Sequence, residues 1–148
     1  MKTNRFNGKV QDQVGFLIKR VQQAFRARMD EVLLESGLTT SQYAVLTHLR
    51  EASSLSNAEL ARRSFVTAPT MIRIVHDLEQ LQFIEKAESK THKKIIDVAL
   101  TPKGKKTLNL CESVVQSIQV QMLSGFNELD VTRLSKLLIS CAENLEER

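Results

Sequence analysis

The segment TAPTMIRIVHDLEQ, from Thr67 to Gln80, carries side chains that could contact base edges or phosphates. Four apolar residues recur at helical spacing and predict a buried side: Met71, Ile74, Val75 and Leu78. The opposite side carries Arg73, His76 and Gln80, and it lacks the Glu–Lys pairs at i, i+4 that are usual on solvated helices. A guanidinium such as that of Arg73 can donate two parallel hydrogen bonds to guanine O6 and N7, or bind a phosphate.

The positive charge of the chain is local. The net charge of +4 arises from unequal segments: residues 82–106 carry seven basic and three acidic groups, whereas residues 107–148 carry three and six. Residues 1–36 carry seven basic and four acidic groups, and residues 37–81 balance at four each. A local excess favours contact with a polyanion over a general effect on solubility.

Periodicity and capping residues predict helices on the N-terminal side of this segment. Apolar residues step by three and four from Val10 to Leu33, which predicts a long helix that ends at Ser36-Gly37. Thr39 with Gln42, and Ser56 with Glu59, have the spacing of capping boxes, so a second helix and a short third helix follow. The SSLS segment between them is interpreted as a polar break.

Thr67 caps the segment described first, and Pro69 lies in its first turn. Between residues 83 and 100 the period changes to two, which predicts a β-hairpin of strands 83–86 and 95–100 with ESKTHKK in its charged tip. Thr101-Pro102 then begins another helix, and Asp130 is expected to cap the last one.

This order predicts a mainly α fold with a small β-hairpin wing, that is, a winged helix-turn-helix plus a helical dimerisation region. We expect an N-terminal dimerisation helix in residues 1–37, the winged helix-turn-helix in 38–104 and C-terminal dimerisation helices in 105–148. The apolar stripes of the outer helices exceed what the small domain can cover. A second copy of the chain is the simplest cover, which predicts a two-fold homodimer.

Three segments together resemble the MarR family of bacterial transcription regulators: LTTSQYAVLTHL (38–49), SNAELARRSFVTAPTMIRIVHDLEQLQFIEK (56–86) and VALTPKG (98–104). The resemblance implies a dimer that binds pseudo-palindromic, double-stranded operator DNA. It also implies a response to small aromatic, lipophilic or oxidising effectors.

The chain departs from the family pattern at three places. Gln82 stands where the family commonly has Gly, and Ile72 where it commonly has Thr or Ser. In the wing, His92-Lys93-Lys94 replaces an Asp-x-Arg pattern, so the planar fork of an arginine is lost there.

In a helix-turn-helix the second helix lies in the major groove, with its N-terminal residues against DNA. The predicted DNA-binding residues on that helix are Thr67, Ala68, Pro69, Thr70, Ile72, Arg73 and His76. The predicted wing and flanking contacts are Arg62, Arg63, Lys86, Lys90, His92, Lys93 and Lys94. A solvated basic loop, and surface salt bridges for the two arginines, are the alternative interpretations.

By the same resemblance, an effector pocket would involve Phe16, Leu17, Arg20 and Tyr43, although plain core is the alternative for each. Cys111 and Cys141 fall on apolar stripes and are expected to be buried thiols. The three histidines, His48, His76 and His92, are scattered, so we expect no metal and no cofactor.

Several classes of protein are disfavoured. The chain has no apolar run long enough to span a bilayer and no signal-peptide pattern, so we expect a cytoplasmic protein with reduced thiols. It has no glycine-rich phosphate loop and no catalytic dyad, so an enzyme is not expected. The sequence favours a homodimeric, sequence-specific transcriptional regulator, with repression as its expected role and release from DNA by a small-molecule effector as its expected control. The alternatives are a winged-helix protein–protein adaptor and a thiol- or metal-responsive regulator.

Overall fold

The computed structural model describes residues 8–89 and 92–146. Two short 3-10 helices, η1 (Val10–Asp12) and η2 (Leu34–Ser36), flank α1 (Val14–Leu33). The chain continues in this order: α2 (Thr40–Ala52), β1 (Ser54–Ser56), α3 (Asn57–Arg63), α4 (Ala68–Gln80), β2 (Ile84–Glu88), β3 (Ile96–Leu100), α5 (Pro102–Met122) and α6 (Glu128–Glu146). The predicted mainly α fold with a hairpin wing is confirmed.

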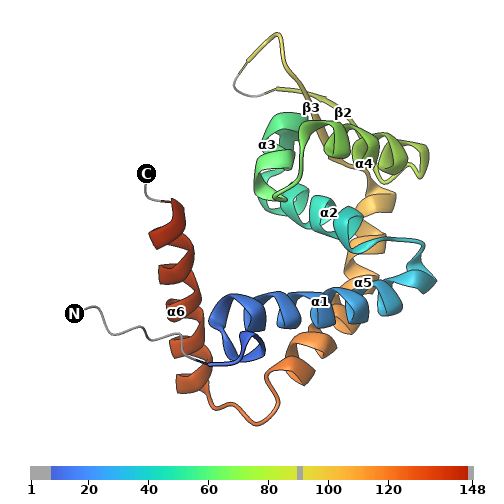
Figure 1. Ribbon diagram of the computed structural model, residues 1–148. Coiled ribbons are helices and arrows are strands. Elements are labelled where there is room, and N and C mark those ends of the chain that lie inside the picture. Colours follow the sequence, from blue (N-terminus) through green and yellow to red (C-terminus); the bar gives the residue numbers. More distant parts are fainter. Residues whose placement is uncertain (1–7, 90–91, 147–148) are drawn as a thin grey trace.

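The elements form two parts (Figure 1). Helices α2, α3 and α4 and the hairpin form one lobe, whereas α1, α5 and α6 form an open helical frame. Helix α5 starts beside β3 in the lobe and runs into the frame, where it packs along α1. The lobe is therefore held on the frame mainly by one continuous helix.

The sheet has three strands in the order β1-β3-β2, both pairs antiparallel. The two hairpin strands begin one residue later than predicted, and β1 was not predicted at all. Interpreting SSLS as a polar break was wrong because Leu55 is buried while Ser54 and Ser56 are only half-buried, in the usual alternation of a strand. The Ser54 hydroxyl also donates to Asp97 of β3 across 3.2 Å, which helps to hold the short strand in place.

The core lies inside the lobe and continues along α1 and α5. Its fully buried members include Leu46, Leu60 and Met71 in the lobe and Leu108 in α5. Each such side chain contributes about 1.5–3 kcal/mol relative to leaving it exposed. Gly104 lets the start of α5 lie directly against the backbone before β2, because a Cβ there would lie 2.0 Å from the carbonyl oxygen of Phe83.

The predicted caps are mostly confirmed. Thr39 and Gln42 form a full capping box. Ser56 accepts from the Glu59 amide, but the Glu59 carboxylate binds arginines, so the second predicted box is only half formed. The prediction that Asp130 caps the last helix was wrong. Asn127 caps α6 by accepting from the amide of Asp130, and the Asp130 carboxylate accepts from the amide of Asn127.

Three helical segments end in the same motif, in which one left-handed residue lets two amides close the last turn. That residue is Gly37 after η2, Phe65 after α3 and Gln82 after α4, with φ of 69°, 54° and 60°. In the last case the Phe83 amide donates to Leu78 and the Gln82 amide to Glu79. A side chain at such a φ costs roughly 1–2 kcal/mol, and only one of the three residues is a glycine.

The helical frame leaves apolar surface uncovered. An apolar groove of about 490 Å³ runs between its helices. Its lining includes Leu17, Val21 and Phe25 of α1, Met122 of α5, and Leu134 and Leu138 of α6. No residue of α6 is buried by the described part of the chain.

None of the described helices is long and apolar enough to cross a membrane.

We predict that Gln82→Gly raises the free energy of unfolding by about 0.5–1 kcal/mol, because glycine adopts the left-handed conformation without a Cβ penalty. Chemical denaturation of the purified protein measures the change. Gln80→Gly is the matched control: it places the same substitution in the helix itself and lowers stability by about 0.5–1 kcal/mol. A loss of stability in both variants would contradict the strain argument.

Candidate nucleic-acid interface

Helix α4 is oriented by its buried side. Met71, Val75 and Leu78 are buried in the lobe, so the opposite face of the helix points to solvent. All seven residues predicted for this helix and its cap are exposed: Thr67, Ala68, Pro69, Thr70, Ile72, Arg73 and His76. The Thr67 hydroxyl caps the helix by accepting from the Thr70 amide, and Pro69 lies in the first turn as predicted.

The polar groups of this face are available for a partner. Arg73 makes no hydrogen bond or ion pair within the part of the chain that the structure describes. Nδ1 of His76 lies 3.6 Å from the Asp77 carboxylate, and the two side chains form an ion pair only when the imidazole is protonated. The face therefore presents one free guanidinium and one imidazole on a rigid, capped helix.

Helix α3, which precedes α4, carries an arginine clamp formed by Glu59, Arg62 and Arg63. The Glu59 carboxylate accepts from Nε and a terminal nitrogen of Arg62 at 3.0 and 2.6 Å, and from Nε of Arg63 at 2.8 Å. These hydrogen bonds lower the pKa of Glu59 to about 2 and raise the pKa of Arg62. The salt-bridge alternative is thus formed in the free protein, and a phosphate would have to compete with Glu59 for both guanidinium groups.

Sequence interpretation missed the role of Glu59 in this clamp, although its signal was present. Glu59 precedes Arg62 and Arg63 by three and four residues, which is the spacing at which helical side chains pair. The pattern S-x-x-E favoured a capping box, whereas the carboxylate in the structure accepts from the two arginines.

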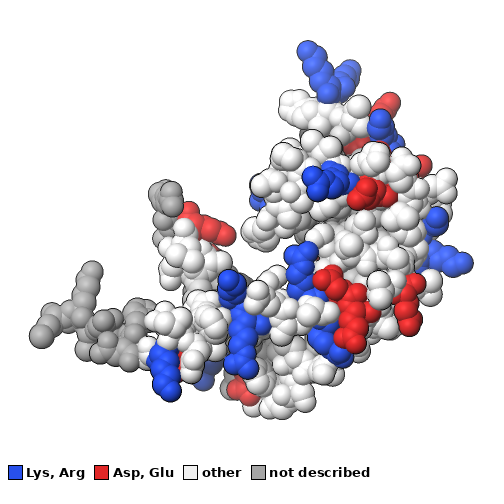
Figure 2. Space-filling model, turned by 45° about the vertical axis from the view of Figure 1, so that its right-hand side comes forward, with Lys and Arg blue, Asp and Glu red and all other residues white. Residues whose placement is uncertain are grey.

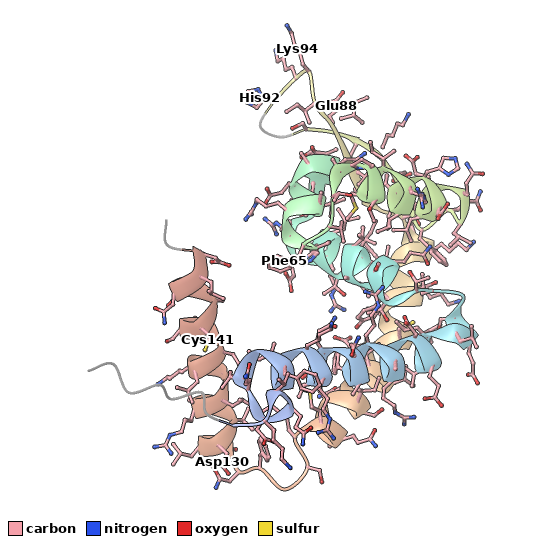
Figure 3. The ribbon with its side chains drawn as sticks, in the orientation of Figure 1. Phe65, Glu88, His92, Lys94, Asp130 and Cys141 are labelled. Carbon is pink, nitrogen blue, oxygen red and sulfur yellow. The ribbon has the colours of Figure 1, made fainter. Side chains whose placement is uncertain are left out.

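The wing, formed by β2, β3 and their connecting tip, projects from the lobe. Figure 3 shows His92 and Lys94 at the tip, well away from the helices. Lys86, Lys93 and Lys94 are exposed, and basic side chains stand at the top of the molecule in Figure 2. Lys90 lies outside the described residues. The tip thus presents positive charge in an exposed position where it can meet a phosphate backbone.

The apolar groove of the helical frame includes one of the predicted effector residues. Leu17 lines the apolar groove, whereas Phe16, Arg20 and Tyr43 are not part of its lining. Phe16 and Arg20 are exposed; Tyr43 is half-buried, and burial raises the pKa of its phenol.

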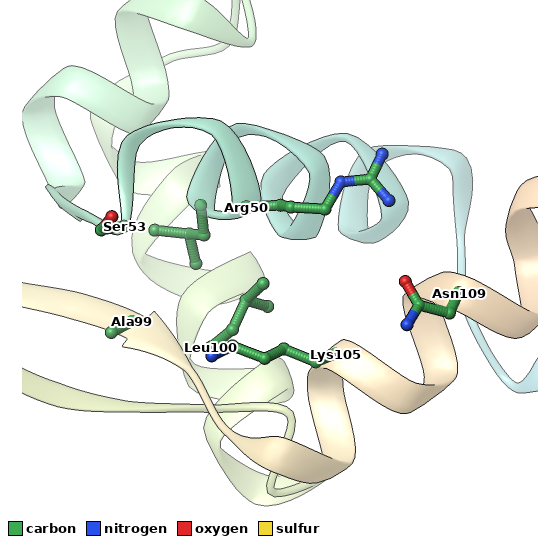
Figure 4. A pocket seen from close by; sticks show the side chains of 7 residues that line it. Arg50, Ser53, Ala99, Leu100, Lys105 and Asn109 are labelled. Carbon is green, nitrogen blue, oxygen red and sulfur yellow. The ribbon is translucent and has the colours of Figure 1, made fainter.

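A separate hollow of about 420 Å³ lies between α2, β3 and α5 (Figure 4). It is lined by two cations, Arg50 and Lys105, and by Asn109. Figure 4 shows that Arg50 and Lys105 point to opposite ends of the hollow. Arg50 also pairs with Glu112 at 3.4 Å, so the hollow offers no convergent site for an anion.

The two cysteines differ. Cys111 is buried, as predicted, and its Sγ lies 3.2 Å from the Ser36 hydroxyl. Cys141 is exposed on α6, so the prediction of a buried thiol was wrong for this residue within the single chain. The described residues contain no cluster of three or more His, Cys, Asp or Glu side chains placed to hold a metal.

A three-helix lobe whose last helix, α4, is capped and faces outward, followed by a basic hairpin, defines a winged helix-turn-helix. Residues 36–95 match the model of the MarR family. The chain is 31% identical to the uncharacterized HTH-type transcriptional regulator YybA of Bacillus subtilis over 109 residues, which are 74% of this chain and 73% of YybA. The chain belongs to the MarR family of transcriptional regulators.

Two further comparisons agree with this assignment. The HTH-type transcriptional repressor Rv2887 of Mycobacterium tuberculosis is 28% identical over 111 residues, 75% of this chain and 80% of the repressor. A mutant of Escherichia coli MarR, crystallised in complex with operator DNA, has the same fold. Its TM-score is 0.79 at 22% identity, and the match covers 90% of this chain and 99% of that chain.

We predict that Glu59→Gln increases affinity for duplex DNA at low salt and steepens its salt dependence. The substitution removes the negative charge that pairs with both guanidinium groups, and each new phosphate contact adds about 0.9 to the slope of log affinity against log salt. Fluorescence anisotropy with a labelled duplex at several salt concentrations measures this slope. Glu31→Gln, which breaks the similar pair with Arg28 on α1, should leave the slope unchanged. An unchanged slope in Glu59→Gln would show that neither arginine reaches a phosphate.

The ion pairs of Glu59 with Arg62 and Arg63 also predict that the stability of the fold depends on pH. Because the pKa of Glu59 in the folded chain is about 2, below its ordinary 4.5, the ion pairs stabilise the fold fully above pH 4.5. That contribution is lost as the pH falls through about 2. Thermal unfolding of wild type and Glu59→Gln should therefore differ at pH 6 and converge near pH 2.

Proposed function

We propose that this chain is a homodimeric, sequence-specific DNA-binding regulator that represses transcription, acting in the cytoplasm. The observation that carries the proposal is the outer face of α4, where buried apolar residues hold a free Arg73 toward solvent beside a basic wing. The E. coli relative of the same fold was crystallised with operator DNA, which supports the same use of this lobe.

Within this proposal α4 lies in the major groove. Ala68 and Thr70 are small, and with Pro69 they allow the start of the helix to approach the DNA closely. Arg73 reads guanine O6 and N7 or binds a phosphate, and His76 lies one turn farther along. The lysines of the wing contact the backbone of the flanking DNA, which positions the helix but specifies no sequence.

A second copy of the chain completes the helical frame. The groove between α1, α5 and α6 is lined almost entirely by apolar side chains, and α6 buries no residue within the described part of its own chain. Helices α1 and α6 and most of α5 fall within the segments 1–37 and 105–148 that we propose as dimerisation regions. A two-fold arrangement presents two copies of α4 to two half-sites, which explains a pseudo-palindromic operator.

A small aromatic or lipophilic effector that binds near the frame would act by changing the distance between the two α4 helices. The distance must match half-sites about one helical turn, or about 34–36 Å, apart. The effector can shift the equilibrium only by its difference in affinity for the two arrangements. Thermal-shift screening of small aromatic acids tests this part of the proposal.

We predict that Arg73→Ala weakens binding to the promoter region flanking its own gene by about 10- to 100-fold for each half-site, the loss expected for one bidentate base contact. Mobility-shift titration measures the change. Arg28→Ala removes the same charge from α1, outside the proposed DNA-binding face, and is the matched control. Absence of any shift by the folded wild-type dimer at low salt would overturn the proposed function.

We predict that Leu138→Glu weakens dimerisation by about 100-fold or more, because the substituted side chain lies in the groove twice per two-fold dimer. Analytical ultracentrifugation over a range of concentrations measures the dissociation constant. Ser140→Glu adds the same charge to α6 at a position that does not line the groove. Equal dissociation constants for the two variants would mean that the interface lies elsewhere.

A further inference from the structure

One large aliphatic side chain stands on the outer face of α4 among its polar groups. Ile72 is 58% exposed, whereas the apolar residues Met71, Val75 and Leu78 of the same helix are buried. It is the largest apolar side chain on that face. The arrangement is not explained by packing within the lobe, because more than half of its surface is open to solvent.

Ile72 is held as a rigid surface. A β-branched residue within a helix has one strongly preferred χ1, so little side-chain freedom is lost when it meets a partner. Ala68 lies one turn before it and His76 one turn after it, and Arg73 is its neighbour. The methyl groups of Ala68 and Ile72 therefore form an apolar strip beside the two polar groups that can read bases.

The partner chemistry follows from what the major groove contains. Base pairs present hydrogen-bond donors and acceptors there, and one apolar group, the C5-methyl of thymine. An isoleucine placed against a phosphate or an amino group would remove water from a polar group without replacing its hydrogen bond. An isoleucine placed against a thymine methyl removes water from two apolar surfaces at once.

We propose that Ile72 is a specificity-determining residue that packs against a thymine C5-methyl in each half-site, with Ala68 extending the contact. This inference rests on the proposed DNA-binding function. Ile72 selects a T·A pair at one position, and Arg73 selects or anchors an adjacent one. The methyl, and not the hydrogen-bonding edge of the thymine, is what Ile72 recognises.

The test uses a duplex selected by the wild-type dimer from a random-sequence pool. Each thymine of one half-site is replaced by deoxyuridine, which lacks only the methyl group. The symmetry-related thymine of the other half-site is replaced with it, and each duplex carries one such pair of replacements. At one position wild-type affinity should fall about four-fold per half-site, the effect of one buried methyl group. Ile72→Ala should bind the thymine and deoxyuridine duplexes equally at that position.

Two controls keep the outcomes distinct. Ile96→Ala removes a similarly exposed isoleucine, 62% exposed, from the wing and should retain the preference for thymine over deoxyuridine. Thermal unfolding of Ile72→Ala should match wild type, because the side chain contributes little to the core. If the pool yields a specific duplex but no thymine shows a methyl effect that depends on Ile72, this proposal is overturned and the DNA-binding function stands. If no sequence is enriched, the proposed function fails first and this proposal with it.

Discussion

The burial of one side of α4 is the constraint on which the interface depends. Met71, Val75 and Leu78 are anchored in the lobe, and their spacing fixes the rotation of the helix about its axis. With that rotation fixed, Arg73 and His76 cannot turn inward. The Thr67 cap and the left-handed residue that follows the helix then fix where it begins and ends. The core of the lobe therefore determines which side chains face a partner.

Charge in the lobe is arranged in two different ways. Lys86, Lys93 and Lys94 of the wing are exposed to solvent, whereas Arg62 and Arg63 are already paired with Glu59. Exposed lysines give binding that is weakly selective and sensitive to salt. Paired arginines are released only when a phosphate binds more favourably than the carboxylate does, so a loosely placed duplex gains less from them than a fitted one. In the proposed DNA complex, this pairing would disfavour binding in the wrong register.

Much of the fold was predictable because it depends on local chemistry. The caps at Thr39 and Thr67 depend on residues only a few positions away, and both are present in the structure. The periodicity of α4 is equally local, and the face that it predicts to be exposed is exposed. The failures involve distant or competing partners. Strand β1 exists because it pairs with β3, and 43 residues separate Ser54 from Asp97. The Glu59 carboxylate had two possible local partners, and spacing alone could not choose between an amide and two guanidinium groups.

The left-handed Phe65 has a consequence for the turn between α3 and α4. Its side chain is 89% exposed and points away from the lobe (Figure 3), so no packing within the described chain compensates for the strain of its backbone. The turn is consequently one place where the backbone of the lobe is strained without compensating contacts from its own side chain. In an evolving lineage, glycine or asparagine at such a position can raise the stability of the fold. That gain can offset the destabilising effect of new substitutions on the exposed face of α4.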